Sequence, residues 1–499
     1  MTDLLHAGLE RAAATAGDRV AVRVDEQAWT FADLHDASTA FAHHLAGRGV
    51  GPRHRVAVMT TNRVEFPIAV NAISKLGAAA VLLSPAWKAA EVDHAFALTD
   101  PVHAVADGAA AELLAGRLGA GAVTDLDAVA NAPDRRALPA TDVGPDDEAI
   151  LVFSSGTTGL PKAVRHTHRS IGRGTAHWVE SLGLTAADRF QVATPPSHIL
   201  GLLNLLAATE AGASVRLHRR FDLDEVLRRI GSDRITLEMA VAPIALAIAG
   251  HPELEGFDLS SLRYIMWGAT PVTASVAEAV TARTGVRWLP AYGASELPVI
   301  ACNPVDRPDE WRLDSAGLPG PEVELRVVDL DSAAVLEPGE IGEIQARSPS
   351  LMKGYLPEVA NEDAFVDGWY RTGDVGWLEP EGWVHLTDRS KEMIKVKGFQ
   401  VAPAEVEAVL HGHPSVVDCA VFGIDDEQAG EVPVAAVQLD PADPVDPAEL
   451  QQLVRDSLAT YKQLRHIVIV DVVPRLPSGK VLRRTLRDEW APKLAASDA

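Results

Sequence analysis

One ten-residue stretch decides the fold of this chain: Phe153-Ser154-Ser155-Gly156-Thr157-Thr158-Gly159-Leu160-Pro161-Lys162. It follows the apolar run 149–153, which predicts a buried strand. Its small hydroxylated residues and two glycines let the backbone turn closely around an anion, and Lys162 adds a positive charge. A mobile Ser/Thr/Gly connection is the alternative, but the whole string after a strand predicts a phosphate-binding loop. It is not a Walker A loop, because no Gly-Lys-Ser/Thr closes it.

The size and charge of the chain limit its organisation and its partners. Its 499 residues exceed what one hydrophobic core supports, so we expect two or more domains. A formal net charge of −24 disfavours a nucleic-acid partner, since phosphate backbones require a basic surface. A phosphate-bearing substrate must therefore be met by local positive charge and by metal.

Several features of the sequence predict a cytoplasmic protein. Cys302 and Cys419 lie far apart without metal-ligand spacing, which suits a reducing compartment and no disulfide framework. The N-terminus lacks the pattern of a signal peptide, and the last residues are not a peroxisomal address. No apolar run approaches membrane-spanning length, so we expect no membrane partner.

The first half of the chain alternates strand and helix patterns. Residues 55–60 predict a strand, 64–76 an amphipathic helix and 79–83 a second strand, which together predict a parallel, helix-covered sheet. Thr30 and Asp33 resemble a capping box that opens a helix with an apolar face. Further predicted strands lie at 102–106, 149–153, 191–193, 214–217, 262–266 and 286–289.

The pattern of apolar and polar residues changes after residue 320. Residues 323–329 and 342–346 alternate in the antiparallel manner, which predicts a β-rich subdomain at about 320–388. Beyond it, a helix beginning near Pro403 and further strands and helices predict a compact α+β unit. The fold class is therefore α/β, with a large domain at 1–388 built from mostly parallel sheets and the β-rich subdomain. A hinge at 389–391 and a small, mobile α+β lid domain at 392–499 complete the predicted division.

Five further strings join the phosphate loop in a fixed order. They are 292–296 (YGASE), 370–374 (YRTGD), 388–391 (DRSK), 397–405 (KGFQVAPAE) and 474–480 (PRLPSGK). Together they resemble the adenylate-forming superfamily of acyl-CoA synthetases, peptide-synthetase adenylation domains and luciferases, over essentially the whole chain. The strings at 397–405 and 258–263 (DLSSLR) look most like the 4-coumarate–CoA ligase branch.

This resemblance implies an ATP-dependent acid–thiol ligase that uses Mg²⁺ and coenzyme A. A carboxylate attacks the α-phosphate of ATP, and the acyl-adenylate then passes to the thiol. Glu296 matches the magnesium-binding carboxylate, with Thr158 beside the metal. Asp374 matches the ribose-binding residue, next to Arg389. The implied ATP-binding residues are Ser154, Ser155, Gly156, Thr157, Thr158, Gly159, Lys162, Gly268, Ala269, Thr270, Ala291, Tyr292, Gly293, Ala294, Ser295, Asp374 and Arg389.

The resemblance also assigns roles to residues of the hinge, of the small domain and of the thiol site. Lys480 matches the lysine that reaches the α-phosphate and the attacking carboxylate, where a compact point charge suits two anions. Lys391 occupies the hinge position, about which the small domain is expected to swing. Lys395 and Gln400 match catalytic residues of the coumarate ligases, and Lys397, Gly398 and Phe399 are expected in the coenzyme A tunnel. His198 matches a histidine between acid and thiol, with a structural histidine as the alternative.

The acid pocket is expected to be small and without charge. Its implied lining is Ile199, Leu200, Leu203, Asn204, Met239, Ala240, Trp267, Gly293, Pro298 and Val299. Trp267 stands where the coumarate ligases have a smaller residue, and Leu297 replaces an Ala-Gly pair. Both departures favour a small aromatic or short acid, although Trp267 pointing into the core is the alternative.

Two other functions remain open from the sequence. Some coumarate-ligase-like proteins activate nitrite to diazotise an arylamine, and a reduced pocket suits that small oxyanion. A non-catalytic nucleotide-binding protein is the alternative of another class, but it predicts erosion of Lys480, Glu296 or Asp374, and all are present. No carrier domain follows the small domain, so the expected partners are a small-molecule acid, ATP and coenzyme A.

Overall fold

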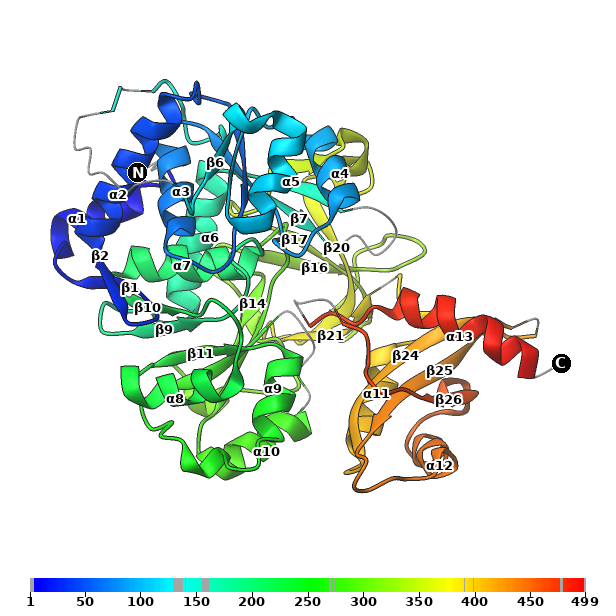
Figure 1. Ribbon diagram of the computed structural model, residues 1–499. Coiled ribbons are helices and arrows are strands. Elements are labelled where there is room, and N and C mark those ends of the chain that lie inside the picture. The colour runs from blue at the N-terminus through cyan, green and yellow to red at the C-terminus, as the bar shows by residue number, and fades with distance from the viewer. Residues whose placement is uncertain are drawn as a thin grey trace.

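The computed structural model describes residues 4–128, 138–139, 141–154, 161–268, 272, 274–389, 391–397, 399–426, 428–475 and 479–497. Within them the chain forms four sheets with helices packed on the larger ones (Figure 1). The predicted α/β class is confirmed, since several sheets contain parallel strands and a smaller unit follows at the C-terminus (Figure 1).

A seven-stranded sheet carries the phosphate-loop segment. Its order is β18-β8-β7-β4-β3-β5-β6. Strands β3 and β4 pair in parallel, and helix α3 connects them along the chain, as the sequence predicts. The strands are β3 (Arg55–Met59), β4 (Ala79–Leu82), β5 (His103–Ala106), β6 (Val123–Asp125), β7 (Glu148–Ser154), β8 (Lys162–Thr167) and β18 (Gly354–Leu356), and the helices are α2 (Phe31–Ala46), α3 (Glu65–Lys75), α4 (Ala89–Thr99) and α5 (Gly108–Leu118).

The capping box that opens α2 is confirmed. Thr30 Oγ1 accepts a hydrogen bond from the Asp33 amide, and an Asp33 oxygen accepts one from the Thr30 amide at 2.9 Å. Such reciprocal bonds satisfy amides that the first helical turn leaves without partners. The predicted apolar face follows, with Phe31, Leu34 and Leu45 buried.

A nine-stranded sheet stands beside the first. Its order is β15-β14-β13-β12-β11-β9-β10-β1-β2, parallel from β13 to β1. The strands are β1 (Val20–Val24), β2 (Gln27–Thr30), β9 (Arg189–Val192), β10 (Ser214–Leu217), β11 (Leu237–Ala240), β12 (Tyr264–Trp267), β13 (Trp288–Tyr292), β14 (Ala301–Cys302) and β15 (Leu318–Pro319), with helices α1 (Ala7–Ala16), α6 (His168–Ser181), α7 (Ile199–Ala211), α8 (Leu223–Asp233), α9 (Ala242–Ala249) and α10 (Ala274–Thr284).

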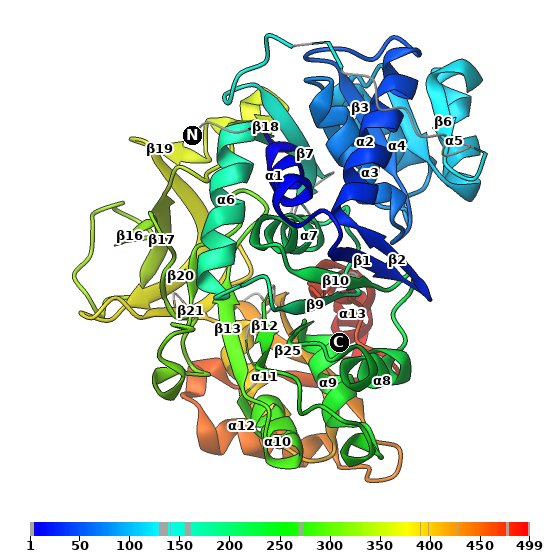
Figure 2. The ribbon, with the colours of Figure 1, turned by 90° about the vertical axis from the view of Figure 1, so that its left-hand side faces the viewer.

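One buried apolar cluster joins the two large sheets. It includes Val56 and Ile150 of the first sheet and Phe190 and Val215 of the second. Figure 2 shows α6 and α7, which contribute Trp178 and Leu203 to this cluster, between the sheets. Burying such side chains stabilises by about 1.5–3 kcal/mol each, so the cluster fixes the sheets relative to one another.

The β-rich subdomain and the C-terminal unit each have their own sheet. The first has the order β16-β17-β20-β19, with β21 also paired to β20, and the second has the order β23-β22-β25-β24, with β26 also paired to β25. The elements are β16 (Glu324–Val328), β17 (Gly342–Arg347), β19 (Phe365–Val366), β20 (Trp369–Leu378), β21 (Val384–Arg389), β22 (Ile394–Val396), β23 (Phe399–Val401), α11 (Pro403–His411), β24 (Val416–Asp426), β25 (Gly430–Leu439), α12 (Pro447–Ser457), β26 (His466–Ile469) and α13 (Arg483–Ser497).

Two features of the topology were not predicted. The strand before the phosphate loop pairs antiparallel with β8, where Ser154 lies opposite Lys162. The hairpin of β1 and β2, which joins the edge of the nine-stranded sheet, was not predicted. Over the residues that the structure describes, no helix has both the length and the apolar character needed to cross a bilayer.

Candidate active site

A cavity of about 440 Å³ lies where the carboxyl ends of β4, β7, β12 and β13 meet the C-terminal unit. Ligands of α/β proteins commonly bind at this end of the strands, because loops from neighbouring strands converge there. The described lining residues are Leu82, Ser84, Trp87, Glu91, Phe153, Ser154, Pro161, Trp178, Thr194, Pro195, Ser197, His198, Ile199, Leu200, Leu203, Val241, Met266, Gly268, Ala291, Tyr292, Gly293, Ala294, Ser295, Glu296, Pro298, Arg389, Lys480 and Leu482.

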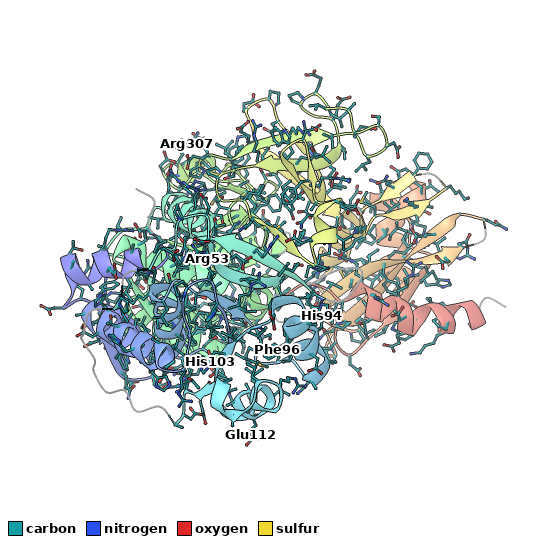
Figure 3. The ribbon with its side chains drawn as sticks, turned by 90° about the horizontal axis from the view of Figure 1, so that it is seen from above. Arg53, His94, Phe96, His103, Glu112 and Arg307 are labelled. Atoms are coloured by element: carbon teal, nitrogen blue, oxygen red, sulfur yellow. The ribbon has the colours of Figure 1, made fainter. Side chains whose placement is uncertain are left out.

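The cavity brings together many of the predicted nucleotide-binding residues. Ser154, Gly268 and the run 291–296 line it beside Arg389. Other predicted residues lie outside the described ones, namely Ser155, Gly156, Thr157, Thr158, Gly159, Ala269, Thr270 and Gly398. Pro161, near the end of the phosphate-loop string, is held from α4, where His94, labelled in Figure 3, donates through Nε2 to the Pro161 carbonyl at 2.8 Å.

The 293–298 loop is a tight turn that only glycine permits at its start. A Cβ at Gly293 would lie 2.1 Å from the Pro298 carbonyl oxygen, which no real structure tolerates. The buried His166 donates from Nε2 to the Ser295 carbonyl at 2.8 Å, and burial lowers the pKa of His166 to about 4. His166 is thus a neutral, buried support for this loop.

Asp374 lies directly behind the cavity wall. Its two oxygens are held by the Tyr292 hydroxyl, which donates at 2.5 Å, and by Arg389 Nε at 3.0 Å. Asp374 and Arg389 face one another across β20 and β21, which fixes their separation. Burial, followed by the charge of Asp374, raises the pKa of Tyr292 far above its usual value, so the hydroxyl remains a donor. Asp374 itself does not line the cavity.

Glu296 presents the one buried carboxylate at the turn. It is 8% exposed, and one oxygen accepts a hydrogen bond from the Tyr355 hydroxyl at 2.7 Å. Mg²⁺ is usually held by one or two carboxylates together with phosphate oxygens and water, so a single positioned carboxylate fits this ion. Lys162 does not line the cavity; its Nζ lies 4.8 Å from the centre of the Tyr355 ring.

Lys480 reaches the cavity from the C-terminal unit. Its Nζ is buried, and among the described residues it has no hydrogen-bond partner. The carboxylate of Glu392 lies 3.7 Å away. Burial, followed by the charge of Arg389, lowers the pKa of Lys480. A buried ammonium without a hydrogen-bond acceptor is unfavourable by itself, which is the arrangement expected of a group that meets an anionic ligand.

The predicted thiol-side residues lie elsewhere. Lys395 and Gln400 face one another across the β22–β23 hairpin, and both are exposed. Lys397 and Phe399 are also exposed, and the Phe399 ring stacks on Tyr461 with centroids 4.5 Å apart. None of these four lines the cavity in this structure, whereas Lys480 does. Lys391, the predicted hinge residue, is exposed.

His198 lines the cavity at the start of α7. Its Nδ1 accepts a hydrogen bond from the Leu200 amide at 3.3 Å, so the proton of the neutral ring lies on Nε2. Burial lowers the pKa of His198 to about 4, which keeps the ring neutral at physiological pH. A neutral imidazole with a free N–H is suited to donate to a carboxylate.

The acid side of the cavity differs from the prediction. Ile199, Leu200, Leu203, Gly293 and Pro298 line it as expected. Trp267 does not, and the interpretation that it shrinks the pocket was wrong. Side chains alternate along β12, so Met266 faces the cavity while Trp267 packs against Trp288 with ring centroids 5.1 Å apart.

Four other predicted lining residues also lie away from the cavity. Asn204, Met239, Ala240 and Val299 are buried but are not among its described lining residues. The lining that the sequence missed is Trp178, Thr194, Pro195, Ser197, Val241 and Met266. Strand alternation could have found Met266, but Trp178 lies on a helix whose packing against α7 has no local signal in the sequence.

Comparisons with known proteins agree with this site. A family model described as AMP-binding enzyme matches residues 9–356, and one described as AMP-binding enzyme C-terminal domain matches residues 405–480. The chain is 36% identical to 4-coumarate–CoA ligase 2 of Oryza sativa subsp. japonica, over 93% of this chain and 88% of the rice protein.

Solved structures give the same result. The anthranilate CoA ligase AuaEII, in complex with anthranoyl-AMP, is 27% identical with a TM-score of 0.91, covering 99% of this chain and 98% of that one. MenE from Bacillus subtilis, in complex with ATP and magnesium ion, is 31% identical with a TM-score of 0.84, covering 96% and 99%. These matches favour an acid–CoA ligase over the nitrite-activating and non-catalytic alternatives. The resemblance seen in the sequence is confirmed: the chain belongs to the AMP-binding enzyme family of AMP-forming ligases.

Proposed function

We propose that this protein joins a small carboxylic acid to coenzyme A at the expense of ATP. The observation that carries the proposal is the position of Lys480, whose buried ammonium group lines the same cavity as Glu296 and Arg389. Two large-domain groups suited to a nucleotide and one small-domain cation thus converge on one space. That convergence supports adenylation as the reaction of this arrangement.

In the first half-reaction a carboxylate oxygen attacks the α-phosphorus of ATP, and pyrophosphate leaves. His198 donates from Nε2 to the acid and orients it, while Lys480 reduces the repulsion between carboxylate and phosphate. Asp374, held by Tyr292 and Arg389, accepts hydrogen bonds from the ribose hydroxyls. Glu296 would hold a magnesium ion, which when bound would neutralise charge on the phosphate oxygens.

In the second half-reaction the thiol sulfur attacks the acyl carbon, AMP leaves, and the thiol proton is released. A second cavity of about 800 Å³ supports a route for the thiol, because it shares Thr194, Pro195 and Val241 with the first. We propose that the small domain turns about residues 389–391, withdraws Lys480 and brings Lys395 and Gln400 inward. Lys397, Gly398 and Phe399 then border the thiol.

The compartment follows from the two thiols. Cys302 and Cys419 are both buried and free. We propose a cytoplasmic protein, since a reducing compartment keeps such thiols unpaired.

The direct test is pyrophosphate release with a panel of benzoates, cinnamates and short acids, run with and without coenzyme A. We expect acid-dependent pyrophosphate release in both cases and an acyl thioester only with coenzyme A. Adenylate formation without any thioester would overturn the assignment of coenzyme A as acceptor, and an amine or a carrier protein would then be tested. No pyrophosphate with any acid would overturn the ligase itself.

A further inference from the structure

One tryptophan of helix α6 lines the cavity beside α7. Trp178 lies on α6 and is 3% exposed, yet it lines the cavity together with Leu200 and Leu203 of α7. One turn earlier on α6, Gly174 lies against Pro298, so the helix is packed directly on the 293–298 turn. Helix α6 is thus packed against the turn that carries Glu296, while Trp178 itself bonds to α7.

A chain of buried hydrogen bonds fixes the orientation of this indole. Trp178 Nε1 donates to Asn204 Oδ1 at 2.8 Å, and Asn204 Nδ2 donates to Met239 Sδ at 3.3 Å. Asn204 lies one turn after Leu200 on the same face of α7, but unlike Leu200 it does not line the cavity. The indole therefore stands between the cavity and an amide that would otherwise be open to a polar substituent of the acid.

The lining residues that come from α6, from α7 and the segment before it, and from the ends of β11 and β12 include no ionised side chain. They are Trp178, Thr194, Pro195, Ser197, His198, Ile199, Leu200, Leu203, Val241 and Met266, whereas the lining residues Glu91, Glu296, Arg389 and Lys480 come from other elements. A carboxylate or ammonium at the far end of the acid would be buried without a partner. The whole cavity, shared by nucleotide and acid, holds only about 440 Å³.

We infer that Trp178 sets the substrate class of this ligase: short or single-ring monocarboxylic acids without a polar group at the far end. This inference rests on the proposed function. It also predicts that para-substituted cinnamates are poor substrates, because the indole occupies the space their substituent needs. Trp178 acts by direct contact with the acid, and Asn204 acts through Trp178.

The test compares kcat/KM for pyrophosphate release with benzoate, cinnamate, 4-methylcinnamate and 4-hydroxycinnamate. In the unaltered protein we expect benzoate to exceed both para-substituted acids. Trp178→Phe, and Trp178→Leu, which removes more of the side chain, raise the ratio of kcat/KM for the para-substituted cinnamates to kcat/KM for benzoate. The expected increase is about tenfold or more, the usual effect of a few carbon atoms in an apolar pocket. The 4-hydroxy acid gains more than the 4-methyl acid, because Asn204 becomes accessible.

Two controls make the outcome specific. Trp267→Phe alters a buried tryptophan on the opposite face of β12 and leaves all ratios unchanged. Asn204→Leu combined with Trp178→Phe removes the preference for the 4-hydroxy acid. Unchanged ratios in both Trp178 variants, with pyrophosphate still formed, would overturn the inference while the ligase function stands. Absence of pyrophosphate with every acid in the unaltered protein would instead overturn the function.

Discussion

At the scale of single residues, the hydroxyl of Tyr292 connects the cavity wall to Asp374, the proposed ribose-binding residue. It donates to Asp374 Oδ2 at 2.5 Å, and Arg389 holds the other oxygen. Tyr292→Phe removes one charge-assisted hydrogen bond, worth about 1.5–3 kcal/mol. We expect ATP to bind about tenfold more weakly or worse, as measured by isothermal titration calorimetry.

A second buried tyrosine supplies the control for that prediction. Tyr264 donates to the Leu182 carbonyl at 2.5 Å and does not line the cavity. Tyr264→Phe should lower the unfolding temperature and leave ATP affinity unchanged. Equal ATP affinity in Tyr292→Phe and the unaltered protein would contradict the role given to Asp374.

Glu238 predicts a pH dependence of stability. It is buried on β11, where Gln191 Nε2 donates to it at 2.6 Å, and burial raises its pKa to about 8. The folded protein therefore holds this proton more tightly than the unfolded chain does. The stabilisation is complete below the unfolded pKa, near 4.5, and is lost as the pH rises through about 8.

Glu238→Gln keeps an acceptor for Gln191 and removes the titration. We expect the variant to be more stable than the unaltered protein at pH 8.5 by about 2 kcal/mol, and to be close to it at pH 5. Denaturant unfolding at both pH values checks this. Parallel pH profiles for the two proteins would show that Glu238 is not protonated in the folded state.

At the scale of elements, the segment between β21 and β22 positions the lysine. Glu392 on this segment lies 3.7 Å from Lys480 and 2.5 Å from Arg483, which is itself anchored to Glu407 at 2.7 Å. The charge of Glu392 raises the pKa of Lys480, against the larger lowering by burial. Glu392 is thus a positioning residue that keeps the ammonium charged.

Glu392→Gln should move the pH profile of adenylation. It retains an acceptor for Arg483 but removes the negative charge, so the pKa of Lys480 falls further. The alkaline limb of the activity profile therefore moves to lower pH, because only the protonated lysine assists adenylation. Glu405→Gln is the matched control, since Glu405 pairs with Lys462 at 2.6 Å and not with Lys480. An alkaline limb identical in both variants would contradict the positioning role.

The elements also show what a sequence can and cannot predict. Residues 55–60 and 79–83 were predicted as parallel strands because period and chain connectivity are local properties, and β3 and β4 confirm them. The direction of the Trp267 side chain depends on which face of β12 meets the cavity. The size of the indole alone suggested the face toward the cavity, but Trp267 packs in the core on the other face. The position of Trp178 at the cavity could not be predicted from the sequence, because it depends on how α6 packs on α7. There Trp178 bonds to Asn204, which is 26 positions away in the chain.

At the scale of the whole molecule, the residues proposed for the two half-reactions lie apart on the small unit. Lys480 lines the cavity, while Lys395 and Gln400 are exposed on the β22–β23 hairpin and do not line it. The roles proposed for the two sets therefore predict different placements of the small unit in adenylation and in thiol transfer, with residues 389–391 as the proposed hinge.

The measurement that tests this most directly separates the two half-reactions in Lys480→Ala and Lys395→Ala. Adenylation is followed by pyrophosphate release, and transfer by thioester formation from a supplied acyl-adenylate. We predict that Lys480→Ala loses adenylation by about 10²–10³-fold, the usual effect of removing one group that stabilises developing charge, while it retains transfer. Lys395→Ala should show the reverse. Adenylation at the unaltered rate in Lys480→Ala would contradict the account.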